Sequence, residues 1–161
     1  MLKRVLALFL SVFVFLSVIS CEKEDFSHCE MTVPLTDKFE RIYSESFDAA
    51  FSDGVLSVAL LRISFEAAEL DGIPISMSSE KFARFWLQNS GRYADVFLHN
   101  GVDCAEYKDT ENGALYSTVS AFYRSKYAYF VLIFTVNEFD FESYRDSIYE
   151  YISGVYFTDE K

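Results

Sequence analysis

The pattern of hydrophobic and polar positions divides the chain into an apolar leader, a short polar segment and a long series of alternating elements. In the leader, Lys3-Arg4 precedes an apolar stretch over 5–19. A basic start followed by a short apolar run is typical of a secretory signal peptide. The run is shorter than the roughly 20 residues that a helix needs to cross a bilayer, and Glu22 follows at once. We therefore expect residues 1–20 to form a signal peptide that is removed.

Behind the leader, apolar runs separated by turn residues predict strands in antiparallel pairs. Asn100-Gly101 is the strongest two-residue signal for a hairpin, and Ser52-Asp53-Gly54 separates two further apolar runs. The run at 129–134 is apolar on both faces, which favours a central strand covered on at least one side. Pro34 suits an edge strand, because proline lacks a backbone donor. The predicted strands cover 31–35, 46–51, 55–64, 94–99, 102–108, 114–124 and 127–136.

One helix is predicted between Ser78 and Gly91. Ser78 is a good N-cap, Met77 before it can pack against Phe82, and Gly91 supplies a stop. The segment 65–75, ahead of this helix, fits neither a strand nor a helix pattern clearly. The residues at helical spacing are Phe82, Phe85, Trp86 and Asn89.

A second helix is predicted near the end of the chain. Apolar residues recur every three or four positions from Phe141 to Val155, as on an amphipathic helix. Gly154 ends this helix, and 155–157 can return to the sheet. With 17 Phe and 11 Tyr, the composition also favours sheet, since aromatic side chains pack well on a pleated surface. The prediction is a single α+β domain over 30–161, an antiparallel sheet packed with two main helices.

Three segments carry a resemblance to a known fold. They are Val33-Pro34-Leu35 with Phe39, the strand 127–135, and the stretch 141–157. In this order they resemble the PsbP/Mog-type fold, and the similarity covers nearly the whole chain behind the leader. The resemblance implies a binding or assembly protein, because members of this fold act in that way. Its motifs concern packing, so no functional residue is carried over.

The end of the leader carries the most specific motif. Val18-Ile19-Ser20-Cys21 resembles the lipobox of bacterial lipoproteins, which implies lipid transfer to the Cys21 thiol and cleavage before it. Buried acyl chains hold a protein at a membrane, since each methylene contributes about 0.8 kcal/mol. We expect membrane lipid as a partner through acylated Cys21, a lipidated tether over 21–29, and a location outside the cytoplasm. The alternatives are an ordinary signal peptide with a chance cysteine, or an uncleaved anchor.

Charge excludes one class of partner. The chain has 14 basic and 25 acidic side chains and a net charge of −11. Removing residues 1–20 takes away Lys3 and Arg4, leaving 12 basic against 25 acidic side chains, or −13. Nucleic acid requires clusters of Lys and Arg to displace counterions, and none is present. The charge suits a solvated surface or a cationic partner.

Catalytic and metal chemistries find little support. His28 and His99 are the two histidines, and neither stands in a Ser/His/Asp or Cys/His signature, so we predict that the protein is not an enzyme. Together with Cys29 and Cys104 they could form a site for zinc or copper. However, His28 and Cys29 are adjacent and would point apart on a strand, so no metal and no cofactor are predicted.

Two other groups of residues have a structural interpretation beside a functional one. Cys29 and Cys104 are read as a possible disulfide in an exported domain, the alternative being two reduced, buried thiols. Glu66, Glu69 and Asp71 could bind calcium, but they lack the alternating ligands of a calcium loop, and a solvated acidic face is the preferred interpretation.

The tyrosines suggest a further possibility, a groove for a carbohydrate or a peptide, although most of them are expected in the core or on a sheet face. We predict a membrane-anchored, non-enzymatic protein-interaction or assembly module, with a small-ligand or metal-binding lipoprotein as the alternative. A ligand binder should show a pocket with convergent polar groups, whereas an interaction module should show an exposed apolar surface. The tyrosines concerned are Tyr93, Tyr107, Tyr116, Tyr123, Tyr127 and Tyr129.

Overall fold

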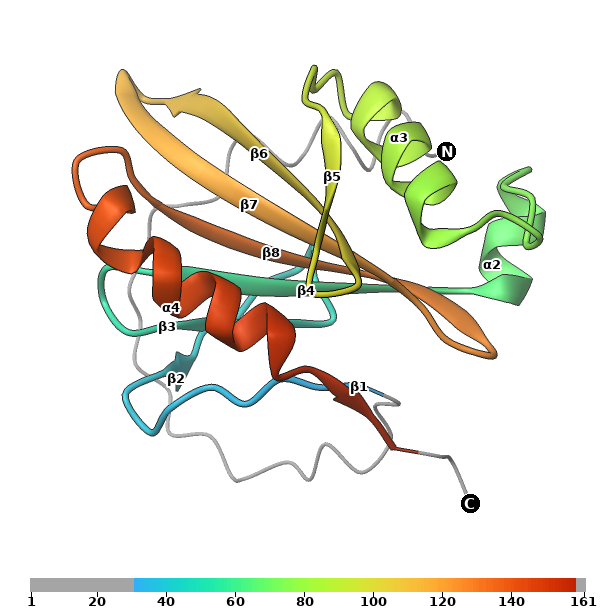
Figure 1. Ribbon diagram of the computed structural model, residues 1–161, viewed down its shortest axis with the longest axis horizontal. Coiled ribbons are helices and arrows are strands. Elements are labelled where there is room, and N and C mark those ends of the chain that lie inside the picture. The colour runs from blue at the N-terminus through green and yellow to red at the C-terminus, as the bar shows by residue number, and fades with distance from the viewer. Residues whose placement is uncertain (1–30, 159–161) are drawn as a thin grey trace.

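A seven-stranded antiparallel sheet forms the centre of the computed structural model, which describes residues 31–158 (Figure 1). Its strand order is β2-β3-β4-β8-β7-β6-β5, and a second sheet contains only β1 and β9. The strands are β1 (Met31–Thr32), β2 (Glu40–Arg41), β3 (Ala49–Ser52), β4 (Ser57–Ser64), β5 (Val96–His99), β6 (Val102–Glu111), β7 (Ala114–Arg124), β8 (Ala128–Asn137) and β9 (Tyr156–Phe157). The helices of this part of the chain are α2 (Phe65–Leu70), α3 (Ser79–Asn89) and α4 (Phe141–Ser153).

Two tight turns set the register of the strands that follow α3. Asn100 and Gly101 both have positive φ, 48° and 85°, which is the backbone of a two-residue hairpin turn. The prediction of a β5–β6 hairpin is therefore confirmed. Asn112 and Gly113 repeat this geometry at 50° and 82° between β6 and β7, so the strand predicted over 102–108 continues to Glu111.

The helices cover both faces of the sheet (Figure 1). Successive side chains of a strand point to opposite faces, and β8 is buried on both of them. Phe130, Leu132 and Phe134 belong to the core beneath α4, whereas Val131 and Ile133 belong to the core beneath α2 and α3. This confirms that 129–134 is a central strand.

Both predicted helices are confirmed. The Ser78 side chain accepts a hydrogen bond from the backbone N–H of Lys81, as expected of an N-cap, and Gly91 beyond the helix has a positive φ of 73°. Helix α4 ends before its C-cap, Gly154, and buries Ile148 and Ile152. The undecided segment 65–75 contains the short helix α2 and a turn.

The ends of the described region differ from the prediction. Residues 31–35 were expected to form an edge strand of the main sheet, but only Met31–Thr32 is a strand, and it pairs with β9 in the separate sheet. Residues 155–157 therefore return to β1 and not to the main sheet. Beyond Thr32 the backbone turns, with the Leu35 N–H donating to the Val33 carbonyl. This sheet-dominated α+β architecture agrees only loosely with the PsbP/Mog-type resemblance.

The leader, Cys21 and the tether lie outside the described residues, so they stay predictions. Within 31–158, no helix is long and apolar enough to cross a membrane.

Candidate interaction surface

The two edges of the main sheet differ in chemistry. The β2 edge carries Glu40 and Arg41, both exposed, and charged side chains of this kind protect an edge from pairing with another chain. The opposite edge is β5, with the sequence Val96-Phe97-Leu98-His99 and no acidic or basic residue apart from the histidine. In the described part of the molecule, the β5 edge is thus the less protected of the two.

The register shows which backbone groups the β5 edge presents. His99 and Val102 flank the two-residue turn and pair with each other, so they exchange the hydrogen bonds nearest to it. Because hydrogen-bonded and non-bonded pairs alternate in an antiparallel ladder, Phe97 also bonds to β6, while Val96 and Leu98 direct their N–H and C=O groups outward. Within 31–158, no strand lies beyond β5 to pair with them.

Apolar side chains surround this free backbone. Phe97 and Leu98 are both exposed, Leu98 at 68%, and they point to opposite faces of the sheet. The Phe97 ring lies 6.4 Å from the ring of Tyr149 on α4. Tyr93, in the loop that leads into β5, is also exposed. An added strand would therefore meet apolar side chains on both faces.

Polar contacts fix α4 against the strands β5 and β6. The Tyr149 hydroxyl donates to Glu106 Oε1 at 2.5 Å, and Arg145 Nη2 donates to the same oxygen at 3.1 Å. Burial, followed by the hydrogen bond to Glu106, raises the pKa of Tyr149, which keeps its hydroxyl protonated as a donor. At the other end, Asn100 Nδ2 donates to Ser153 Oγ at 3.0 Å. The side of α4 that faces β5 and β6 is thus held in place.

The outer side of α4 next to these contacts is negatively charged. Glu142, Asp146 and Glu150 are exposed and follow one another at four-residue spacing, so they form one stripe, called here the acidic flank. Asp146 is three residues from Tyr149, which places the stripe beside the contacts to β5 and β6. Arg145, on the same side, is already paired with Glu106.

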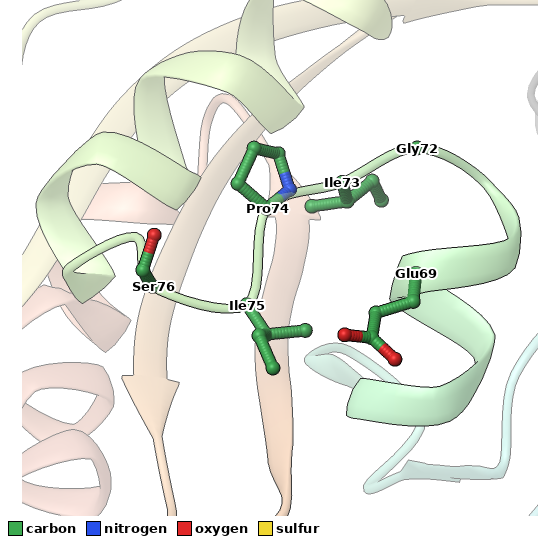
Figure 2. Close-up of a pocket in the computed structure, with 6 residues that line it drawn as sticks. All are labelled: Glu69, Gly72, Ile73, Pro74, Ile75 and Ser76. Atoms are coloured by element: carbon green, nitrogen blue, oxygen red, sulfur yellow. The ribbon is translucent and has the colours of Figure 1, made fainter.

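A first hollow lies at the loop after α2, lined by Glu69 and residues 72–76 (Figure 2). It has a volume of about 420 Å³ and is wide open to solvent. Figure 2 shows Glu69 and Ser76 at opposite ends of the lining. The Tyr129 hydroxyl lies beneath the loop, donating to the Pro74 carbonyl at 2.9 Å. The polar groups therefore do not converge on a common point.

A second hollow of about 290 Å³ lies between residues 31–39 and the sheet. Its walls are apolar apart from Thr32 and Thr36, and they include Phe39 and Leu132. A ligand site usually adds a few convergent polar groups to such an apolar lining. Neither hollow shows the arrangement that the small-ligand alternative requires.

The residues considered for metal binding and catalysis do not assemble within 31–158. His99 lies against Tyr149, with ring centroids 4.4 Å apart, and its Nε2 is 3.2 Å from the Asn100 amide. In this part of the chain, no group of three His, Cys, Asp or Glu residues could hold a metal, and the acidic residues Glu66, Glu69 and Asp71 do not form a calcium site.

Cys104 is fully buried in the core beneath α4. Burial, and after it the nearby carboxylates of Asp103 and Glu106, raises the pKa of its thiol to about 12. The proposed partner Cys29 and the histidine next to it, His28, lie outside the described residues. The Cys29–Cys104 disulfide therefore stays a prediction.

The six tyrosines do not form a groove. Tyr129 and Tyr123 are buried in different cores, and Tyr107 lies under the Arg92 guanidinium with its hydroxyl 2.8 Å from Ser120 Oγ. Tyr93 and Tyr127 are exposed, but in the loop before β5 and in the turn before β8, respectively. Tyr116 is half-buried on β7.

Sequence reasoning did not identify the β5 edge as a functional surface. The hairpin itself was visible in Asn100-Gly101, but the position of a strand at the edge depends on the order of all seven strands.

No protein-family model matches the chain, and no curated protein matches it in sequence. Among solved structures, a protein from Bacteroides thetaiotaomicron is 14% identical with a TM-score of 0.57, over 81% of this chain and 46% of that one. LpqN from Mycobacterium tuberculosis, a protein involved in cell envelope biogenesis, is 11% identical with a TM-score of 0.49, over 80% of this chain and 83% of that one. The chain thus spans less than half the length of the first protein, and that likeness shows a shared fold only.

Proposed function

We propose that this protein is a lipoprotein of the bacterial cell envelope, anchored through acylated Cys21 outside the cytoplasm, and that it acts as a non-enzymatic protein-interaction or assembly module. The basic and apolar leader and the lipobox-like residues 18–21 support the anchor. The order of hairpin, helix, antiparallel sheet and C-terminal helix is loosely compatible with the PsbP/Mog type, to which the resemblance assigns the domain. The observation that carries the interaction role is the β5 edge, which within 31–158 has no further strand beside it, carries no Asp, Glu, Lys or Arg, and exposes Phe97 and Leu98.

The partner segment pairs with β5 as an additional strand. The outward N–H and C=O groups of Val96 and Leu98 supply its backbone hydrogen bonds, and the side chains of Phe97 and Leu98 contact its alternate residues. The acidic flank of α4 favours a segment that also carries Lys or Arg, because opposite charges steer association. An extended, apolar segment with basic residues is therefore the expected ligand.

The small-ligand or metal-binding alternative has no comparable support in the described residues. The hollow at Glu69 is open, and the hollow beneath 31–39 has an apolar lining without convergent polar groups. We therefore keep one candidate function.

Replacing Leu98 by proline tests whether a partner strand pairs with the β5 edge. The Leu98→Pro change removes the outward backbone donor, and the bonds from Phe97 and His99 to β6 remain in place. Loss of one backbone hydrogen bond to the partner, about 1.4 kcal/mol, corresponds to about a tenfold loss of affinity. The measurement is cross-linking in native membranes, followed by affinity purification through a C-terminal tag and quantitative mass spectrometry of the recovered partner.

The matched controls separate the edge from general effects of mutation. Leu98→Val keeps the donor and an apolar side chain, and Tyr43→Ser removes an exposed aromatic ring near the opposite, β2 edge. Both variants should recover the partner at the wild-type level. Cys21→Ala should not recover it, because that variant lacks the proposed anchor. Equal recovery with Leu98→Pro, in a protein whose urea unfolding is unchanged, would exclude strand addition at β5.

A further inference from the structure

A second exposed aromatic surface lies at the corner where the N-terminal segment joins the domain. It consists of Tyr127 in the β7–β8 turn and of Tyr156 and Phe157 in β9, which are 48%, 54% and 40% exposed. Lys126 lies over the Tyr127 ring, with its Nζ 5.1 Å from the ring centroid. These four residues are called the anchor-side corner.

Contacts within the domain bring the parts of this corner together. The Phe157 ring packs 5.5 Å from Phe130, near the start of β8, and 6.0 Å from Tyr123, near the end of β7. Tyr127 lies three residues before Phe130, or about 10 Å along the chain. Phe157 therefore lies beside the end of the β7–β8 hairpin whose turn carries Tyr127, although the two residues are distant in sequence.

The N-terminal segment enters the domain at this surface. Met31 pairs directly with Phe157, and Thr32 pairs with Tyr156. Met31 is ten positions after Cys21 in the sequence, and a chain of ten residues can span at most about 35 Å. A lipid on Cys21 therefore keeps the anchor-side corner within that distance of the membrane, an argument that rests on the proposed function.

The side chains suit the boundary between lipid and water. Tyrosine has an apolar ring with a polar tip and is enriched at membrane interfaces. Glu66, Glu69 and Asp71 are exposed close by, since Phe65 N–H at the start of α2 donates to the Tyr127 carbonyl. With these acids nearby, the attraction comes from burial of the aromatic rings and not from anionic lipid.

We propose that the anchor-side corner contacts the lipid surface of the membrane that holds Cys21. The contact sets the orientation of the domain on the bilayer.

Tryptophan placed at the corner reports this contact directly. The chain has one tryptophan, Trp86, which is buried and gives the same background in every variant. Full-length, lipidated Tyr127→Trp and Tyr156→Trp proteins are reconstituted into vesicles of phosphatidylethanolamine, phosphatidylglycerol and phosphatidylcholine brominated in its acyl chains. The matched control is Phe139→Trp, because Phe139 is exposed beyond the opposite end of β8, about 30 Å from Tyr127.

The expected result is loss of tryptophan emission in brominated vesicles for Tyr127→Trp and Tyr156→Trp, with emission retained for Phe139→Trp. Emission retained in all three variants, in protein that floats with the vesicles, overturns the contact and leaves the lipid anchor intact. Protein that carries no lipid and does not float overturns both the contact and the proposed anchor. The contact is also overturned if the brominated lipid does not quench emission and Tyr127 cross-links to a second copy of the protein. The corner would then be a dimer interface.

Discussion

At the scale of single residues, burial decides which side chains have chemistry to offer. The Cys104 thiol is surrounded by core residues beneath α4, and its pKa is raised to about 12. Such a thiol stays protonated at neutral pH, so it is a poor nucleophile and a poor metal ligand. Cys104 is therefore unsuited to such chemistry, and the acylation site proposed for this protein is Cys21.

The raised pKa of Cys104 predicts that reduced protein loses stability at alkaline pH. In the unfolded chain the thiol ionises near its ordinary pKa of 9.0, whereas in the folded domain it ionises near 12. The stabilising contribution is fully present below pH 9 and is lost as pH rises from 9 towards 12. The free energy of unfolding in urea, measured across this range, checks it.

Burial also raises the pKa of Tyr107, from 10.0 to about 12. Ionisation of Tyr107 therefore adds to the loss of stability in the upper part of the same pH range. Cys104→Ala is the control, because it removes the cysteine share of the pH dependence and leaves that of Tyr107. Identical slopes for wild type and Cys104→Ala would contradict the prediction.

At the scale of elements, local signals at the helix ends determine where helices begin. Ser78 caps α3 with a side-chain hydrogen bond to the Lys81 N–H at 3.3 Å. Asp140 stands at the same position before α4, but its side chain makes no capping bond. The two helices therefore differ in how much their first turn depends on one side chain.

This difference predicts unequal effects of alanine at the two caps. Ser78→Ala should lower the free energy of unfolding by about 1 kcal/mol, because an N–H in the first turn loses its partner. Asp140→Ala, the matched control, should lower it less, since only the attraction of the carboxylate to the helix N-terminus is lost. Urea unfolding of both variants measures the difference, and an equal or larger effect of Asp140→Ala would refute this account of the caps.

At the scale of the whole molecule, charge and anchoring act in opposite directions. With a net charge of −13 after removal of residues 1–20, the protein is repelled by anionic lipid headgroups, so electrostatic attraction does not hold it at a membrane. The acyl groups on Cys21 and the anchor-side corner are the proposed sources of attachment.

Cys21→Ala should therefore move the protein from the membrane fraction to the soluble fraction. Its free energy of unfolding should equal that of wild type, because Cys21 is ten residues from the first described strand. Cys29→Ala is the control and should stay with the membrane. Cell fractionation measures where both variants are found, and the mass of the N-terminal peptide shows whether it carries lipid. Membrane retention of Cys21→Ala would argue against lipidation.

Much of the secondary structure follows from the sequence alone, because it depends on neighbouring residues. Asn100-Gly101 specifies a tight turn through the positive φ that both residues adopt, and the spacing of apolar residues specifies α3 and α4. The run at 129–134 is apolar on both faces, which likewise indicates a strand that is buried on both faces of the sheet.

The arrangement of these elements, and with it the candidate surface, was decided by tertiary structure. The pairing of β1 with β9 joins residues more than a hundred positions apart, and two-residue strands carry too little local pattern to predict it. The place of β5 at an edge depends on the order of the other six strands, and the scattering of the tyrosines depends on which face each strand buries. Local patterns thus determined which segments become strands and helices, while long-range packing decided which backbone and aromatic groups remain exposed for a partner.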